Sequence, residues 1–538
     1  MRKKNYHFIA FLLASIVFLN IYVSGTLNSP LSAESRKNSL VPKSPHLKIT
    51  ESVPLSVQSL ESHDPIDING NLDFLTQATL EGWSGTGTPT DPIIIEKYKI
   101  LSNNRITPTF RVKNTDLYFK FCDNQFRQTY SAIGLFNVTN AQIINNDIPS
   151  CQYGVSIDRS HHITVLKNVI HNGDSTIDMR AINVYNSNFT TITNNTVNVS
   201  GMEYSLVVRA LLLDASNNNI ISYNDISNCK NVITSSFSSN NIFQNNQIHD
   251  CNGGVYFDHN NNDTFIFNTI KSASLYYMGE YKFSIEVYKG NMTILNNSLI
   301  YNDCALHFTE SDQKTPNKIV VKWNDFIGNY IQAIDNSTNN VFEYNYWDEW
   351  TTPDLNEDGI VDIPYSIEGK ANNHDNYPLT IPNDPNAHFL TRIRFIHPSY
   401  EEETLNGTVT VEWEAKDTQE HKLTYSLYYR FIYERENTSW HFIADLSETS
   451  YQWDTTNVQH VEPLYSGHKP TYILVLRVTC SEGLTLDYHS HGFKLDNSPL
   501  NSQNSVEVIL FVVVFGGIFV ISLVLIYSIF QKFDQKKI

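Results

Sequence analysis

The central part of the chain repeats one short pattern: an apolar residue, two variable residues, an asparagine, one variable residue and a second apolar residue. Residues 143–148, which read IINNDI, and residues 243–248, which read FQNNQI, both follow it. The asparagines recur 21 to 29 residues apart, most often 22. A period of this size predicts a solenoid, in which each repeat forms one coil stacked on the one before. The ten asparagines are Asn124, Asn146, Asn168, Asn195, Asn224, Asn246, Asn268, Asn297, Asn324 and Asn345.

A second pattern alternates apolar and polar residues, which predicts strands with one side in the core. It occurs at 154–158, 181–184, 254–258 and 305–308. Clusters of Asn between these segments predict turns, because asparagine tolerates the left-handed backbone region. The repeated asparagines themselves should be structural, each buried and hydrogen-bonded to the next along the stack.

The ends of the repeat region carry signals of their own. Residues 66–70 predict the first strand, and residues 74–78 predict a short helix that covers the open end of the solenoid. The solenoid with this cap is expected over residues 61–380. Residues 388–496 lose the Asn period and contain longer alternating strands, which predict a β-sandwich.

The two ends of the chain are apolar. Residues 1–25 have the charged start and apolar centre of a signal peptide, and the Ser/Pro/Lys-rich residues 26–60 predict a disordered spacer. Residues 508–530 carry no charge and are long enough for one transmembrane helix. The lysines in the tail, residues 531–538, place it in the cytoplasm. The sequence thus predicts a single-pass protein of the cell membrane with an extracellular ectodomain.

The net charge and the cysteine spacing limit the kinds of partner and of covalent cross-link that we expect. The net charge of −18 argues against a nucleic-acid partner, since such proteins have a basic surface. Cys229 and Cys251 lie one coil apart, at a spacing that suits either a disulfide or two stacked free thiols; Cys151 shares their phase in the repeat.

An acidic column is predicted on one side of the solenoid. Asp158, Asp214 and Asp258 each lie ten residues before a repeated asparagine, and alternation points all three outward. Asp335 occupies the same offset later in the chain. Acids two coils apart would lie about 10 Å apart, at the wide edge of the spacing in inverting glycosidases. These acids are the candidate catalytic residues; a lyase would combine them with Ca²⁺ and a nearby arginine, such as Arg159, Arg180 or Arg209. The alternative is that an Asp before a turn only caps that turn.

Aromatic residues occupy neighbouring outward positions. Tyr256, Tyr288 and Tyr185 are candidate ligand-binding residues, because exposed aromatic rings can stack on sugars. His161, His162 and His259 lie in adjacent turns. The alternative is that the tyrosines are ordinary strand formers.

A possible metal site follows the last repeat. Asp354, Asn356, Asp358 and Asp362 surround a turn glycine, and such alternating oxygens suit Ca²⁺, the one cofactor expected here. The segment departs from the EF-hand pattern, because Tyr365 stands where a bidentate Glu is expected. A plain polar turn is the alternative.

Several of these segments resemble a known family. Residues 345–350, NYWDEW, and 353–365, PDLNEDGIVDIPY, resemble the end of NosD-like β-helices. Residues 82–87 followed by 92–96, PIIIE, resemble archaeal surface proteins of that type. The resemblance, to NosD-like and carbohydrate-binding or sugar-hydrolase-type repeats, covers about residues 66–380. It implies a right-handed parallel β-helix, all-β, with a β-sandwich that looks like a fibronectin-III or immunoglobulin module.

The fold alone does not decide the function. The favoured interpretation is a membrane-anchored surface protein with a binding or structural role toward a glycan or another surface ligand. The alternative is a polysaccharide lyase or glycoside hydrolase that uses the acidic column, in a groove walled by the loops 173–179 and 272–281. A metal-handling role, which the NosD resemblance implies, is the second alternative. The low content of methionine, a copper ligand, argues against copper, since the chain has only 5 Met.

Overall fold

The computed structural model describes part of the chain, which divides into two compact units, Met1–Arg392 with Lys416–Glu420, and Ile393–Ala415 with His421–Ile538. The predicted signal peptide, spacer, transmembrane helix and tail lie outside the described residues, apart from residue 60. No helix within the described part is long and apolar enough to cross a membrane. The described residues are 60–497 without 102–106, 128–129, 150, 172–178, 200–207, 230, 252, 272–282, 310–317, 384–388, 399–402, 434–435, 438–439, 459–470 and 491.

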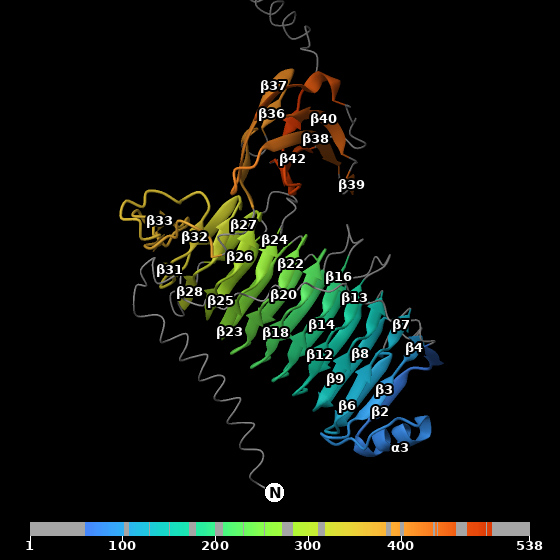
Figure 1. The fold of residues 1–538 in the computed structure, drawn as a ribbon. Coiled ribbons are helices and arrows are strands. Elements are labelled where there is room, and N and C mark those ends of the chain that lie inside the picture. Colours follow the sequence, from blue (N-terminus) through green and yellow to red (C-terminus); the bar gives the residue numbers. More distant parts are fainter. Residues whose placement is uncertain are drawn as a thin grey trace, which may run out of the picture. The chain divides into compact units, whose positions relative to one another are not determined.

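The first unit is a solenoid of parallel strands, as the asparagine period predicts (Figure 1). Each coil contributes strands to three faces, and β23 and β25 bend from face 1 into face 2. Face 1 contains β2 (Ile66–Asn69), β5 (Phe110–Thr115), β8 (Ser131–Val138), β11 (Tyr153–Asp158), β14 (Met179–Tyr185), β17 (Val208–Asp214), β20 (Asn231–Ser236), β23 (Val255–Ile266), β25 (Phe283–Leu295), β27 (Cys304–Phe308) and β30 (Ile331–Asp335).

Faces 2 and 3 complete each coil. Face 2 contains β3 (Ile93–Glu96), β6 (Phe119–Cys122), β9 (Ala141–Ile144), β12 (Thr164–Leu166), β15 (Thr191–Thr193), β18 (Ile220–Ser222), β21 (Ile242–Gln244), β28 (Lys318–Lys322), β31 (Val341–Glu343) and β34 (His374–Asp375), the last paired antiparallel with β33 (Tyr365–Ser366). Face 3 contains β1 (Glu61–His63), β4 (Tyr98–Leu101), β7 (Gln125–Arg127), β10 (Asp147–Pro149), β13 (Val169–His171), β16 (Thr196–Asn198), β19 (Asp225–Ser227), β22 (Gln247–His249), β24 (Thr269–Lys271), β26 (Ser298–Ile300), β29 (Asp325–Ile327) and β32 (Tyr346–Trp347).

Both ends of the solenoid are closed. Helix α3 (Asn71–Glu81) lies at the blue end of the stack in Figure 1, where the sequence predicts a capping helix. Its buried Phe74 contacts Phe119 of β6, with ring centroids 5.0 Å apart. At the other end, the fully buried Trp347 stacks between Phe326 and Tyr365, each at 4.2 Å. The NYWDEW segment therefore forms part of the C-terminal closure.

The predicted asparagine ladder is present and buried. In a typical step, the Asn195 side-chain oxygen accepts from both the backbone N–H and the side-chain Nδ2 of Asn168, each at 3.0 Å. Its own Nδ2 donates to the carbonyl of Val165 at 2.9 Å and to Asn224 at 3.0 Å. All donor and acceptor sites of the amide are thus used, and each rung ties together three successive coils.

At each end of the asparagine ladder, the last amide bonds to a group that is not an asparagine. Asn124 accepts the backbone N–H of Tyr98 at 2.9 Å. At the far end, the buried Asp375 carboxylate accepts the backbone N–H and Nδ2 of Asn345, each at 2.9 Å, and the indole N–H of Trp347 at 3.2 Å. The carboxylate thereby joins the ladder to the C-terminal closure, and its burial raises its pKa above the ordinary value.

Two further ladders, which the sequence analysis did not predict, follow the same principle. In one, hydroxyl and amide oxygens of Ser160, Ser187, Ser216, Ser238 and Asn260 each accept the backbone N–H of the coil before. In the other, Asn219 donates to Asn241, and the backbone N–H of Asn241 donates to Asp263. Asp263 therefore ends its ladder with a carboxyl group that is 1% exposed.

One expected orientation is wrong. Asp335 was expected to point outward like Asp158, but it is fully buried and accepts from Ser337 and Asn340. Its register partner in the neighbouring coil is Phe308, a core residue. The last gap of the repeat is 21 residues instead of 22. The missing residue shifts the strand by one position relative to the asparagine, and a shift of one reverses the side on which a residue lies.

The second unit is built from small, mostly antiparallel sheets. Side chains of two of them meet: the ring of the buried Trp413 lies 5.5 Å from that of Tyr425. The specific β-sandwich topology, with its likeness to fibronectin-III or immunoglobulin modules, stays a prediction. The sheets comprise β35 (Leu390–His397), β37 (Thr408–Asp417) and β41 (Ser450–Asp454); β38 (Leu423–Tyr433), β39 (Glu436–Asn437), β40 (His441–Leu446), β42 (Thr471–Cys480) and β43 (Thr485–His489); and the parallel pair β36 (Thr404–Leu405) and β44 (Lys494–Leu495), with the 3-10 turn Thr455–Asn457.

Replacing one ladder asparagine should destabilise the solenoid strongly. In Asn195→Ala, two donors of Asn168 and the carbonyl of Val165 lose partners in the buried core, and we expect the free energy of unfolding to fall by roughly 3 kcal/mol. Urea unfolding followed by circular dichroism measures this. The control is Asn217→Ala, which removes a partly exposed amide from a turn and should change the stability by less than about 0.5 kcal/mol. Equal midpoints for the two variants would contradict a stabilising role of the ladder.

The buried Asp263 should make stability depend on pH. Burial raises the pKa of its carboxyl from 3.8 to about 7. The folded protein then holds the proton more tightly than the unfolded chain, so stability is highest below about pH 4, falls as the pH rises to about 7 and is level above that, with a total fall on the order of 4 kcal/mol. Asp263→Asn, which has no proton to lose, should flatten this profile.

Thermal unfolding between pH 3.5 and 8 is the measurement. Asp91→Asn, which removes an exposed carboxylate, is the matched control and should keep the wild-type profile. A wild-type-like fall in Asp263→Asn would assign the pH dependence to another group.

Candidate functional site

Face 1 presents three rows of outward side chains, because neighbouring strands are in register. We call them the first, second and third rows, in the order in which the chain passes them along each strand. The first row contains Tyr153, Arg180, Arg209 and Asn231; the second contains Ser156, Asn183, Leu212, Thr234, Tyr256, Glu286 and His307; the third contains Asp158, Tyr185, Asp214, Ser236, Asp258 and, after a register shift, Lys289.

The three candidate catalytic acids lie in the third row, as the sequence analysis placed them, with Tyr185 and Ser236 between them. Asp158 pairs with Arg159, whose Nε is 3.7 Å from it, and Asp258 pairs with the ring of His259. The carboxylate of Asp214 has no partner among the described residues. Of the three acids, Asp214 is therefore the one available for a ligand. Their catalytic role stays a prediction.

A pocket of about 690 Å³ opens on face 1, across β14, β17, β20, β23 and β25. It is lined by residues of all three rows, among them Arg180, Arg209, Asp214, Tyr256 and Glu286. Five strands at the usual spacing span about 19 Å. The pocket is thus a broad depression that crosses these five strands and extends from the first row to the third.

One end of the pocket is cationic. Arg180 and Arg209 are register partners on neighbouring strands. The guanidinium of Arg180 lies 5.7 Å from the ring centroid of Tyr153 and donates to the hydroxyl of Tyr185 at 3.3 Å. These two contacts orient Arg180 while leaving it without a carboxylate partner in the described part of the chain.

Unpartnered polar atoms accompany the arginines. The Nε of Arg209 is buried and has no hydrogen-bond partner. Asn183 of the second row is 1% exposed, yet neither its Oδ1 nor its Nδ2 has a partner. Leaving such groups unpaired costs about 1–3 kcal/mol each, so buried polar atoms without partners call for an explanation, such as a role in binding.

The other end combines hydroxyl, carboxylate and ring groups. Burial and the nearby acids raise the pKa of Tyr256 to about 12, so its hydroxyl keeps its proton at neutral pH and can donate a hydrogen bond. Glu286 lies 3.3 Å from Nδ1 of His307. The ring of Phe283, which also lines the pocket, stacks on His307 at 4.1 Å.

Aromatic rings continue from the pocket across the adjoining turn. Phe237 lines the pocket, is 60% exposed and stacks on His259 with ring centroids 4.9 Å apart. The ring of His259 lies 6.2 Å from that of Tyr288, which is 42% exposed. Of the predicted ligand-binding residues, Tyr185 and Tyr256 line the pocket, and Tyr288 lies beside it on this aromatic strip.

Phe237 and Glu286 were not predicted from the sequence, and His259 was named only as a residue of a neighbouring turn. Phe237 and His259 adopt the left-handed backbone conformation, with φ of 49° and 54°, where an aromatic residue is unusual. Their 22-residue spacing is the one signal that links them. Glu286 was missed because β25 is shifted in register against β23. The loops expected to wall the groove, 173–179 and 272–281, lie outside the described residues except for Met179.

The predicted calcium-binding residues form a tight turn. Asp354 accepts the backbone N–H groups of Asp358 and Gly359 at 3.1 and 3.0 Å, and Asp362 accepts that of Leu355 at 2.6 Å. Asn356 donates to Asp358 at 3.1 Å. The carboxylates thus serve the turn itself and are not among the described groups whose oxygens converge within 4.8 Å. Calcium binding stays a prediction.

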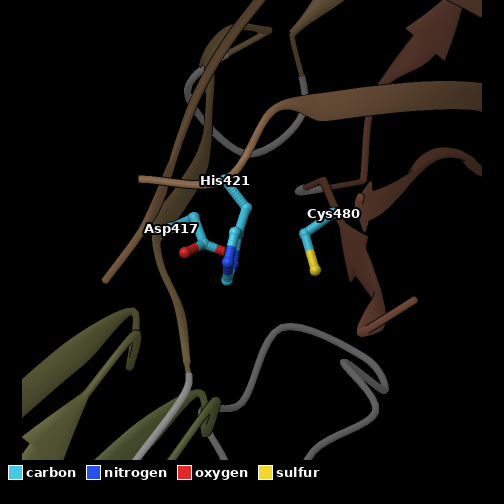
Figure 2. Close-up of side chains that lie close together, drawn as sticks. All are labelled: Asp417, His421 and Cys480. Atoms are coloured by element: carbon cyan, nitrogen blue, oxygen red, sulfur yellow. The ribbon is translucent and has the colours of Figure 1, made fainter. Parts of the chain in front are cut away.

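Two groups of potential metal ligands do converge in the described part. Glu96, Cys122 and Asp123 lie together on the solenoid, where Glu96 pairs with Lys97 at 2.7 Å. Figure 2 shows Asp417, His421 and Cys480. Asp417 belongs to one compact unit and the other two to the second, so no site is assigned to them. The six cysteines are all free thiols, including the stacked Cys229 and Cys251.

The family described as periplasmic copper-binding protein (NosD) matches residues 94–278 and 199–369. Together these matches run over just over half of the 538 residues. The chain belongs to the NosD family. No curated protein matches it.

Two solved structures are similar to this NosD-family chain. The enzymatically active domain of tailspike protein 2 of bacteriophage CBA120 has a TM-score of 0.34 and 10% identity, with 81% of this chain and 72% of that one covered. The full-length tailspike protein 2 from Escherichia coli O157:H7 bacteriophage CAB120 has a TM-score of 0.29 and 10% identity, with 81% and 65% covered. At these values they indicate nothing about what this chain does.

Proposed function

We propose that this NosD-family protein binds a glycan in the pocket on face 1, and that it does so as a surface protein anchored by the apolar segment 508–530. The observation that carries the proposal is the pocket itself. Its volume of about 690 Å³ falls in the usual range for ligand sites, and its lining combines aromatic rings with a few convergent polar groups.

The shape of the pocket supports an extended ligand. It crosses five strands, and the strands of a solenoid form a regular surface on which repeating groups of a polymer can find repeating partners. A saccharide chain has such repeating groups.

The chemistry of the lining supports a sugar as the repeating unit. Phe237 and Tyr256 offer ring surfaces for the apolar side of a sugar, while the Tyr256 hydroxyl, Asp214 and Glu286 offer donors and acceptors for its hydroxyl groups. Within the described part of the chain, the Asp214 carboxylate has no partner that a sugar hydroxyl would have to displace.

Binding without cleavage fits the spacing of the acids better than hydrolysis does. Asp214 and Asp258 are two strands apart, about 10 Å, whereas inverting glycosidases separate their carboxyl groups by about 6.5–9.5 Å. The lining acids Asp214 and Glu286 are three strands apart, about 14 Å. A lyase or hydrolase remains the alternative and is an outcome of the test below.

The family name raises copper as a second alternative, and the donor groups of the matched region do not fit it. Copper sites use imidazole, thiolate or thioether ligands. The converging group within the matched and described residues, Glu96 with Cys122 and Asp123, offers one thiol and two carboxylates. Burial and the neighbouring acids raise the pKa of the Cys122 thiol to about 12, which disfavours the thiolate that would bind metal.

A glycan array probed with the purified protein tests the proposal. We expect binding to one or more glycans, and at least tenfold weaker binding for Tyr256→Ala and Asp214→Asn, since each removes a group that lines the pocket. Tyr223→Ala is the matched control, because Tyr223 is 45% exposed but lies on a different turn of the coil; it should bind like the wild type.

Each bound glycan is then incubated with the protein and analysed for cleavage. Turnover that is lost in Asp214→Asn would replace the binding proposal with the enzyme alternative. Absence of binding to every glycan, or wild-type binding by both pocket variants, would refute the assignment of this pocket.

A further inference from the structure

We infer that the pocket selects saccharides that carry an anionic substituent, a carboxylate or a sulfate ester, and that Arg180 and Arg209 hold this substituent. The inference rests on the proposed glycan-binding function and names the class of glycan.

The first argument is the position of the two arginines. They are register partners on neighbouring strands and both line the pocket. Their backbones are thus about 4.8 Å apart, and like-charged side chains at directly paired positions of neighbouring strands repel each other. An anion between them would replace this repulsion with two charge-assisted interactions. The planar guanidinium matches carboxylate and sulfate oxygens with paired hydrogen bonds.

The second argument is that these arginines lack, among the described residues, the acidic partners that several other arginines of the protein have. Arg111 bonds to Asp67, Arg394 to Glu414 and Arg477 to Asp487. By contrast, within the described part of the chain the Arg180 guanidinium contacts the two tyrosines described above, and the buried Nε of Arg209 has no hydrogen-bond partner there. Neither of these two neighbouring pocket arginines has an acidic partner among the described residues, although the chain contains 56 Asp and Glu against 38 Lys and Arg.

The third argument is the neighbouring amide. Asn183 lies on β14 between Arg180 and Tyr185, in register with the pocket residue Leu212. It is almost completely buried, and both of its polar atoms lack partners. Its Nδ2 would complement an anionic oxygen and its Oδ1 a sugar hydroxyl, so it extends the polar end of the pocket beyond the charges alone.

The acidic surface argues against a general polyanion such as nucleic acid as the ligand. Nucleic-acid binding uses many phosphate contacts on a basic surface, whereas this pocket offers two arginines in a chain of net charge −18. Glu286, three strands from Arg209, and Asp214, at the opposite end of the strand that carries Arg209, would repel a second nearby anion. The arrangement suits a polymer whose charge is confined to one position of each sugar.

The test compares pairs of polymers that differ only in charge: polygalacturonate with its methyl-esterified form, and dextran sulfate with dextran. Binding to the purified full chain is measured by isothermal titration. We expect at least tenfold tighter binding of the charged member of at least one pair, and which pair responds distinguishes a carboxylate from a sulfate ligand.

Variants assign the preference to the two arginines. Arg209→Gln and Arg180→Gln should reduce the ratio within the responding pair to less than threefold. Arg209→Lys keeps the charge but not the paired hydrogen bonds, and should give an intermediate ratio. Arg127→Gln removes an exposed arginine of face 3 and should leave the ratio unchanged. Thermal unfolding of each variant shows whether the fold is retained.

The outcomes separate this inference from the proposed function. Equal binding of both members of each pair, or no binding of the charged polymers, would overturn the anion preference, while glycan binding on the array would still uphold the proposed function. A charge preference that survives in both Arg→Gln variants would also overturn it, because another group would then hold the anion.

Discussion

The hydrogen bond from one buried asparagine to the next is the interaction on which the rest of the structure depends. Each rung joins a backbone N–H, a backbone carbonyl and two side-chain amides from three successive coils. An apolar core opposes a slip of one residue, which would exchange the inner and outer sides of a strand, but a slip of two residues keeps the same sides. Because the amide must meet its neighbour deep in the core, the ladder permits one register.

That register builds the candidate site. No coil contains a pocket by itself: each contributes a few residues to the rows on face 1, and adjacent coils bring these residues together. Arg180 and Arg209 are 29 residues apart in the chain, and Asp214 and Asp258 are 44 apart, yet one and two strand spacings separate them in space. A coil of different length can therefore change one position in a row without disturbing its neighbours, provided that its asparagine stays in the ladder.

The sequence predicts the repeating part of this design better than its exceptions. The ladder and the row of Asp158, Asp214 and Asp258 follow directly from the period, because the same offset from an asparagine means the same place in a coil. The capping helix follows from the need to cover the open end of the stack. The predicted position is wrong where a coil has one residue more or fewer between its face 1 strand and its asparagine. The 21-residue gap turns Asp335 into the core, and the register shift in β25 is the reason that Glu286 was not predicted.

Residues that contradict local preference were missed for a different reason. An aromatic ring at a left-handed turn, as at Phe237, is not what turn propensities predict, and its exposure depends on the turns above and below it. The unpartnered amide of Asn183 likewise has no signature in the sequence, since the burial of an outward side chain depends on its neighbours from other coils. Structural asparagines and a functional one look the same in a chain this rich in asparagine.

The negative net charge of the protein repels an anionic ligand, whereas the two arginines of the pocket attract one. This contrast affects which anionic glycans the pocket would select. Attraction of the whole molecule toward a polyanion is excluded at a net charge of −18, so long-range steering cannot supply affinity for an acidic glycan. Affinity would have to arise at short range, where the first-row arginines meet one substituent. The surrounding carboxylates would then reject ligands whose charges fall elsewhere. An acidic protein with one cationic end to its pocket is thus better suited to recognising the position of a charge on a sugar than to gathering anions in general.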